Sequence, residues 1–151
     1  MKTKVALMFG GKTVEHEVSV ISGIQALKSM DTDKYEVIPV YMTKENDMYT
    51  GPDIGKIESY RDIPALLKHS QRVIMVNDGG RVQLVPYPAK MFGGQKPVAI
   101  DIAFPVVHGT NVEDGALQGY LKTVGVPFVG PDVTSSAISM DKFITKAVLK
   151  E

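Results

Sequence analysis

Cysteine is absent from the 151 residues, which excludes a disulfide framework and a thiolate metal site. Long apolar runs are also missing, because none approaches the roughly 20 residues that a membrane span needs. Neither sign of charge is in excess: 17 Lys+Arg balance 17 Asp+Glu. A nucleic-acid binder or a membrane-surface helix needs a basic footprint, so the sequence predicts neither kind of partner. With no signal-peptide layout at residues 1–5, it predicts a soluble cytoplasmic protein.

The first third of the chain predicts a strand followed by a helix. Residues 5–9 form an apolar run closed by two glycines, as in a strand buried on both faces of a parallel sheet. Apolar residues then recur at helical spacing over 20–27, with Ser19 as a cap or first-turn residue.

Residues 35–41 are rich in β-branched and aromatic side chains and predict a second strand. Pro39 favours an edge or a bulge, because proline cannot donate to a ladder. Strand, helix and strand joined by short links indicate a right-handed, parallel βαβ unit.

The rest of the chain alternates between weak and clear signals. In the middle we expect a hairpin at 47–51, a short helix at 60–69, strands at 73–76 and 81–85 around the turn 78–80, and a loop at 86–97. Beyond it we expect a strand at 99–104, a helix at 117–124 ended by Gly125, a short strand at 127–130 and a helical stretch from 134 to 140. These elements predict an α/β fold: a Rossmann-like parallel sheet flanked by helices, with a less regular middle insertion.

The last segment predicts an amphipathic helix with an apolar face at residues 140, 143, 144, 147 and 148. No glycine, proline or polar tail ends this helix before Glu151. We therefore expect the sequence to be a truncated part of a longer protein.

A first candidate site follows the first strand. Gly10 and Gly11 allow a tight turn and close approach to a ligand, and the helix start offers free N–H groups. The spacing matches neither G-x-G-x-x-G nor the P-loop. Glu15 and Glu17 would repel phosphate and attract an ammonium group, so the loop predicts a cationic or zwitterionic small molecule. Alternatively, both acids only complement the helix dipole, each by about 0.3–1 kcal/mol.

A second candidate site spans residues 108–115. It follows a predicted parallel strand and precedes a helix, which is where open α/β sheets bind ligands. His108 can donate to a carboxylate or an oxyanion, and Glu113 could orient its ring. Alternatively, Asp114 caps the helix and His108 is an ordinary loop histidine with its hydrogen bonds satisfied.

Residues 9–22 read FGGKTVEHEVSVIS and closely resemble the first signature of the D-alanine–D-alanine ligase family. The resemblance implies that Glu15, beside Gly10 and Gly11, holds the amino group of the first D-alanine. In the family this carboxylate belongs to a hydrogen-bonded triad with a serine and a tyrosine from later in the chain. Thr13 stands where many members have serine. Glu17 keeps a structural interpretation as a first-turn acid or cap.

Residues 108–119 read HGTNVEDGALQG and resemble the family's second signature. The resemblance implies that His108 contacts the first D-alanine's carboxylate as it becomes an acyl phosphate, with Gly109 and Glu113 in the substrate loop. Val112 departs from the pattern, which has glycine there. A positive φ at Val112 would cost about 1–3 kcal/mol, so either the loop takes another path or the position has ordinary dihedrals.

Residues 136–142 read SAISMDK and match the family's run into the central domain, where a lysine reaches nucleotide phosphates. Lys142 is therefore the candidate ATP contact, although most helix lysines are simply solvated. The resemblance implies a pre-ATP-grasp domain at 1–135 and the truncated start of the central ATP-grasp domain at 136–151. The Mg²⁺ carboxylates would belong to later domains, so we expect no metal ligands here.

The implied activity is that of an ATP-dependent ligase that makes the D-Ala–D-Ala dipeptide of cell-wall peptidoglycan. The fragment would bind D-alanine feebly and would not turn over alone, and members of the family commonly dimerise through this region. Three alternatives stay open: a ligase that uses D-lactate or D-serine as second substrate, a stand-alone nucleotide-binding module, and a dimerisation or structural module.

Overall fold

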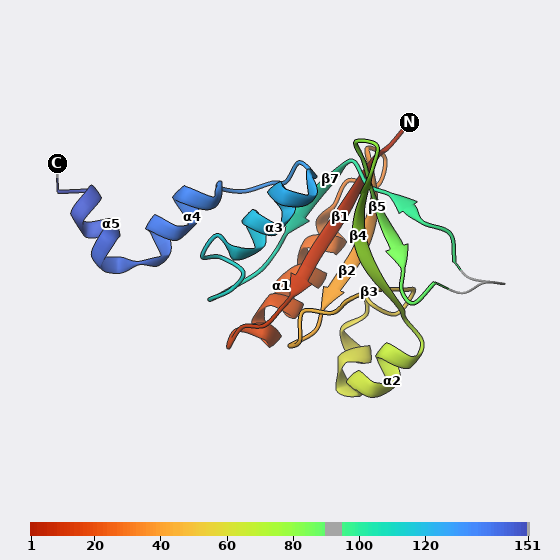
Figure 1. Ribbon diagram of the computed structural model, residues 1–151. Helices are drawn as coiled ribbons and strands as arrows, with labels where there is room; N and C mark the ends of the chain where they lie inside the picture. Colours follow the sequence, from red (N-terminus) through yellow and green to blue (C-terminus); the bar gives the residue numbers. More distant parts are fainter. Residues whose placement is uncertain (90–94, 151) are drawn as a thin grey trace.

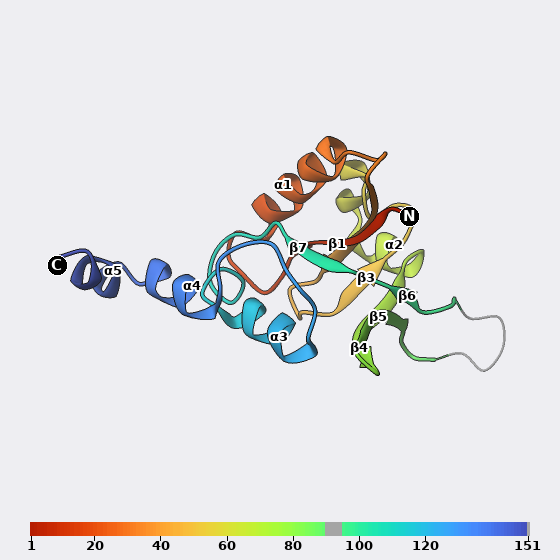
Figure 2. The same ribbon diagram turned by 90° about the horizontal axis from the view of Figure 1, so that it is seen from above.

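A seven-stranded mixed sheet organises the chain, with strand order β6-β5-β4-β3-β2-β1-β7. The computed structural model describes residues 1–89 and 95–150 (Figure 1). Helices cover both faces of the sheet near β1: Figure 2 shows α1 on one side and α3 on the other. The predicted α/β fold with a Rossmann-like parallel part and flanking helices is confirmed.

The parallel part consists of β1 (Thr3–Gly10), α1 (His16–Ser29) and β2 (Tyr35–Met42). Pro39 lies in an inner strand, contrary to the edge position that proline favours. Pairing between β2 and β3 reaches only Tyr41 and Met42, so one side of β2 is still unpaired at Pro39. The local edge explains how an inner strand tolerates the residue.

The middle of the chain extends the sheet with antiparallel strands and a small helical cap. Its elements are β3 (Met48–Thr50), the 3-10 helix η1 (Ile57–Arg61), α2 (Ile63–Lys68), β4 (Gln71–Asp78) and β5 (Arg81–Pro86). The hairpin predicted at 47–51 begins earlier in the chain: β2 and β3 form it around the loop 43–47, and the other side of β3 pairs with β4. The β4–β5 hairpin is confirmed. Of the predicted loop at 86–97, residues 90–94 lie outside the described part.

The predicted strand at 99–104 is in fact two strands at opposite edges of the sheet, β6 (Val98–Ala99) beside β5 and β7 (Ile102–Pro105) beside β1. Between them, the Ile100 N–H bonds to the Val82 carbonyl at 3.0 Å and the Asp101 N–H to the Lys4 carbonyl at 2.9 Å. One short segment therefore joins the two edges, and the sheet is rolled at this end.

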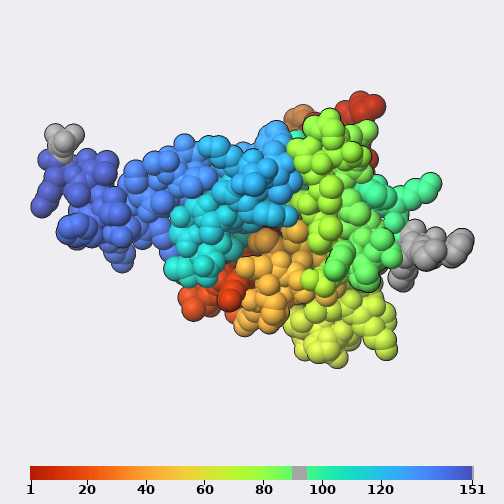
Figure 3. All heavy atoms as spheres, in the orientation of Figure 1, coloured from red at the N-terminus to blue at the C-terminus, as the bar shows by residue number. Residues whose placement is uncertain are grey.

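The carboxyl-terminal part contains α3 (Ala116–Val124), α4 (Val133–Met140) and α5 (Lys142–Val148). Gly125 ends α3 with φ 86°, as expected. The predicted strand at 127–130 is only an isolated bridge between Phe128 and Ala103. α4 and α5 project from the body as an arm (Figures 1 and 3), and α5 contacts α4. The predicted domain boundary after residue 135 falls inside α4 and stays a prediction.

β1 is buried on both faces because each face packs into a different hydrophobic core. Ala6 and Met8 join the cluster that includes Leu117 and Leu121 of α3. Leu7 and Phe9 join the cluster that α1 covers, together with Tyr41, Ile54 and Leu66. The two-sided burial of β1 fixes its carboxyl end, where the first candidate loop begins.

Candidate functional site

The turn after β1 depends on two glycines in the left-handed region. Gly10 has φ 89° and Gly11 has φ 95°. A Cβ on Gly10 would lie 2.3 Å from the Met42 carbonyl oxygen, and one on Gly11 would lie 2.7 Å from Val112 Cγ1. These positions therefore require glycine both for φ and for space.

His16 anchors this turn from inside the protein. It is 4% exposed, with Nδ1 2.8 Å from the Gly11 carbonyl oxygen and Nε2 3.0 Å from the Tyr41 hydroxyl. A carbonyl only accepts, so Nδ1 carries a proton and donates to Gly11, and the Tyr41 hydroxyl can donate to Nε2 when the ring is neutral. No role was predicted for His16. It stands between Glu15 and Glu17 in the sequence, and no spacing rule predicts that a histidine there is buried.

Glu15 occupies the N-cap position of α1, but its side chain does not cap the helix. Its N–H donates to Thr13 Oγ1 at 3.2 Å, and its side chain is exposed. An acid at this end of α1 still complements the helix dipole, so the structural alternative for Glu15 stays open. Glu17, in contrast, lies in the first turn of α1 and pairs with Lys44 at 2.6 Å.

The second candidate loop meets the first directly. Thr13 Oγ1 donates to the His108 carbonyl at 2.8 Å. A Cβ on Gly109, which has φ 93°, would lie 2.3 Å from Thr13 Oγ1 and 3.6 Å from Glu15 Cβ. The fold thus brings together two sequence segments that are almost one hundred residues apart, with a direct hydrogen bond from Thr13 to His108.

Within the second loop, the acidic residues bind the backbone. The Gly109 N–H donates to Glu113 Oε2. Asp114 accepts from the Asn111 N–H at 2.7 Å and from the Ala116 N–H at 3.1 Å, which is the helix-start role considered for it. Glu113 consequently shapes the loop at Gly109.

Val112 has an ordinary φ. Among the described residues, the non-glycine positions with positive φ are Asn46 and Asn111, the latter at 67°. Val112 is 2% exposed and belongs to the core cluster around α3. The left-handed position is therefore one residue earlier, and the strain considered for Val112 does not arise.

Two serines of α1 face the same loop. Ser19 lies in the first turn of α1, one of the two positions predicted for it, and does not cap the helix. It is buried, and its Oγ accepts from the Gly10 N–H and donates to the Val106 carbonyl, both at 2.9 Å. Ser22 Oγ lies 3.0 Å from His108 Nε2. Ser22 was not predicted as a site residue, although the spacing of Glu15, Ser19 and Ser22 places them on one face of a helix.

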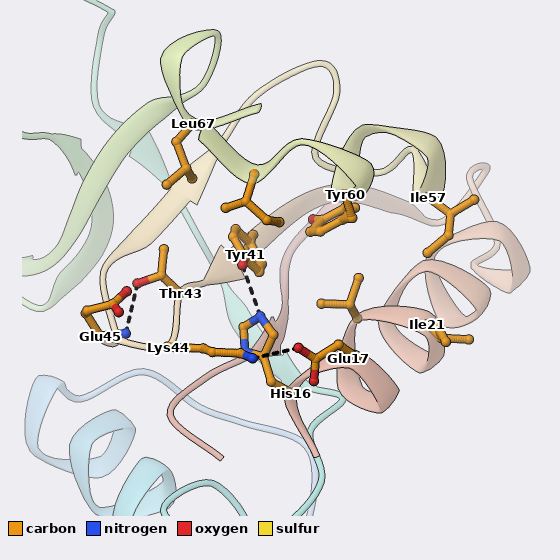
Figure 4. Close-up of a pocket in the computed structure, with 12 residues that line it drawn as sticks. His16, Glu17, Ile21, Tyr41, Thr43, Lys44, Glu45, Ile57, Tyr60 and Leu67 are labelled. Carbon is orange, nitrogen blue, oxygen red and sulfur yellow. Dashed lines mark hydrogen bonds and ion pairs between the residues drawn. The ribbon is translucent and has the colours of Figure 1, made fainter. Parts of the chain in front are cut away.

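A pocket of about 460 Å³ lies on the other side of the turn (Figure 4). Tyr41 and Tyr60 meet edge to face there, with ring centroids 5.1 Å apart, and the Lys44–Glu17 pair lies at its polar end. Burial raises the pKa of Tyr41 to about 12, and the charges of Glu45 and Glu17 add to the increase. Of the acids in the first candidate loop, Glu17 lines this pocket and Glu15 does not.

Lys142 is not brought to this site. It is the first residue of α5, exposed, and α5 lies at the end of the projecting arm (Figure 1). Across residues 1–89 and 95–150, no group of three or more His, Asp or Glu side chains could hold a metal ion. In the same residues, no helix has both the length and the apolarity for a membrane crossing.

Comparison with known proteins identifies relatives over almost the whole chain. A family model described as D-ala D-ala ligase N-terminus matches residues 4–131. The D-alanine--D-alanine ligase of Thermosipho melanesiensis is 39% identical over 147 residues, which cover 97% of this chain and 39% of that protein. The enzyme of the same name from Thermoanaerobacter sp. (strain X514) is 40% identical and covers 99% and 40%.

Solved structures also match this chain over almost its whole length. The D-alanine-D-alanine ligase from Coxiella burnetii superposes with a TM-score of 0.81 at 29% identity, over 99% of this chain and 41% of that one. The VanG D-Ala:D-Ser ligase from Enterococcus faecalis gives 0.77 at 29% identity, over 99% and 41%. The chain thus spans about two fifths of the length of the relatives it matches.

Proposed function

The chain belongs to the family of D-alanine–D-alanine ligase amino-terminal domains, and from this premise we propose that it holds the first D-alanine of an ATP-dependent ligase. The observation that carries the proposal is the contact between the two candidate loops. This contact supports the proposal because Thr13 Oγ1 bonds to the His108 carbonyl, and the exposed residue Glu15 lies two positions after Thr13. One loop offers an acceptor for an ammonium group and the other a donor for a carboxylate.

In this proposal, Glu15 pairs with the ammonium of D-alanine, and Gly10 and Gly11 let the backbone approach it. His108 contacts the carboxylate, while Glu113 holds Gly109 in place. Holding both ends of a zwitterion fixes the orientation of the carboxylate that reacts. A donor at that carboxylate also favours the charge that develops on its oxygens.

The reaction we propose for the whole protein has two steps. The first D-alanine's carboxylate attacks the γ-phosphate of ATP, which forms an acyl phosphate and releases ADP. The amine of a second D-alanine then attacks that carbonyl carbon and loses a proton, and phosphate leaves, which gives the dipeptide used in cell-wall peptidoglycan. Lys142 is the proposed phosphate contact. Mg²⁺ would offset the phosphate charges, and we propose that its carboxylate ligands lie outside the residues that the structure describes.

Charge removal at Glu15 in the full-length protein tests the proposal. Glu15→Gln keeps the size and removes the charge. We expect kcat/KM for the first D-alanine to fall about 10–100-fold, as for loss of a charged hydrogen bond worth about 1.5–3 kcal/mol. Glu17→Gln is the matched control: its pair with Lys44 is exposed, so we expect less than about a twofold change. An unchanged kcat/KM in Glu15→Gln would refute the role of Glu15.

We propose further that residues 1–151 alone do not turn over and bind D-alanine feebly. Phosphate release above background from this chain with ATP, Mg²⁺ and D-alanine would contradict that.

The second substrate remains a separate question, because a D-Ala:D-Ser ligase and a D-Ala–D-Ala ligase match this chain at the same identity. Competition between D-alanine, D-serine and D-lactate on the full-length protein decides it. We also propose that the protein is cytoplasmic and forms a homodimer. Light scattering tests the homodimer.

A further inference from the structure

The imidazole of His108 is held by a side chain from another element. Ser22 Oγ of α1 lies 3.0 Å from His108 Nε2, and both residues are half-buried. His108 follows β7, so the hydrogen bond joins the helix that begins beside Glu15 to the loop that carries the histidine. This contact spans 86 positions of sequence and depends on the tertiary fold.

The position of Ser22 is fixed by the residue three places before it. Ser19 is fully buried, and its hydroxyl bonds both to Gly10 at the end of β1 and to the Val106 carbonyl. These bonds fix the rotation of α1 relative to β1 and β7. Ser22 lies on the same helix face, so its hydroxyl is held in place independently of His108.

The contact distinguishes the two ring nitrogens. Ser22 Oγ forms a hydrogen bond with Nε2, and Thr13 Oγ1 donates to the backbone carbonyl of His108. In the part of the chain that the structure describes, Nδ1 has no hydrogen-bond partner. A group that contacts a carboxylate must donate, so Nδ1 must carry the proton. In a neutral ring this requires an unprotonated Nε2, which can accept from the Ser22 hydroxyl.

We infer that Ser22 is a positioning residue: its hydroxyl holds His108 Nε2 and leaves Nδ1–H for the carboxylate of the first substrate. This rests on the proposed function, because it assumes that His108 contacts that carboxylate. Ser22 itself touches no substrate in this scheme. Its effect reaches the reaction only through the orientation and tautomer of the imidazole.

The test compares three variants of the full-length protein. Ser22→Ala removes the hydroxyl, Ser22→Thr keeps one, and Ser29→Ala is the control, because the Ser29 hydroxyl donates to the Gln25 carbonyl of its own helix. We expect kcat to fall about tenfold or more in Ser22→Ala, as when an orienting partner is lost, with a smaller change in KM. Ser22→Thr should restore most of kcat, and Ser29→Ala should leave it unchanged. Equal kcat in Ser22→Ala and wild type would overturn the inference.

A readout independent of turnover is the tautomer of His108, from the ¹⁵N shifts of labelled histidine. The sequence has three histidines, so His108→Gln assigns the signal. We expect the Nδ1–H form for the neutral ring in wild type and Ser22→Thr, and a loss of that preference in Ser22→Ala. A purely structural serine would not change the tautomer, and an Nε2–H ring in wild type would refute the assignment.

A double variant separates failure of this inference from failure of the proposed function. If Ser22 acts through His108, Ser22→Ala should cause no further loss in a His108→Gln background, and additive losses would overturn the inference. If His108→Gln alone keeps full kcat/KM, the proposed role of His108 fails. In that case the tautomer of His108 in wild type would still show whether Ser22 orients its imidazole.

Discussion

Val112 provides the sharpest stability prediction because its neighbour has the unusual backbone. Val112 is 2% exposed and has an ordinary φ, whereas Asn111 has φ 67°. The same substitution to glycine should therefore cost far more stability at 112 than at 111. Glycine removes a buried side chain at 112 and is conformationally suited to 111.

The magnitude follows from what is removed. Val112→Ala deletes two buried methyl groups, at about 0.8 kcal/mol each plus a cavity term, or about 2 kcal/mol in all. Val112→Gly adds about 1 kcal/mol of backbone entropy, for about 3 kcal/mol. Asn111→Gly relieves the positive φ but loses the 2.9 Å bond from Asn111 Nδ2 to the Lys12 carbonyl. The two effects oppose each other, so we expect a net change within about 1 kcal/mol.

Urea unfolding followed by far-UV circular dichroism measures these differences. At about 2–4 °C per kcal/mol for a chain of this size, Val112→Gly should also lower Tm by about 6–12 °C. Val112→Ala should fall between Val112→Gly and wild type. A Val112→Gly protein as stable as wild type, or an Asn111→Gly protein less stable than Val112→Gly, would refute the assignment of the left-handed position to Asn111.

Two further predictions concern the first turn and the buried tyrosines. Gly10→Ala should destabilise by about 3–5 kcal/mol, because its Cβ would lie 2.3 Å from the Met42 carbonyl oxygen at φ 89°. Gly79→Ala, at φ 59° with no atom within 4 Å, should cost about 1–2 kcal/mol, and thermal unfolding of both variants compares them. Burial raises the pKa of Tyr41 to about 12 and that of Tyr60 as well. Unfolded tyrosine ionises near pH 10, so stability should fall as pH rises from 10 to 12, by about 1–2 kcal/mol for Tyr41 after allowance for solvent screening. Near-ultraviolet absorbance of tyrosinate should show Tyr41 ionising near pH 12 in the folded protein, and ionisation of Tyr41 near pH 10 in the folded protein would contradict this.

The βαβ unit could be predicted because its periodicity is local. The apolar run of β1, the helical spacing of α1 and the β-branched residues of β2 each identify their own element. The division of 98–105 into β6 and β7 could not be predicted. Its residues are apolar apart from Asp101, and the break at Ile100 and Asp101 comes from pairing with β5 on one side and β1 on the other.

The candidate site likewise divides into residues that local sequence predicts and contacts that it does not. Glu15 and His108 could be predicted from loop composition and family resemblance. Their approach to each other, and the roles of His16 and Ser22, depend on contacts between distant segments. Val112 illustrates this most clearly, because the choice between two backbone paths needed the dihedral of its neighbour.

The rolled sheet affects how the folded domain can self-associate at high concentration, as during high-level expression. Its outermost strands are short, with two residues in β6 and four in β7, and the outer side of β7 is already bonded at Ala103 to Pro127 and Val129. Such edges give a foreign strand too little template for amyloid-like stacking. We therefore expect any self-association of the folded domain to use side-chain surfaces and to leave the strand ladder unextended.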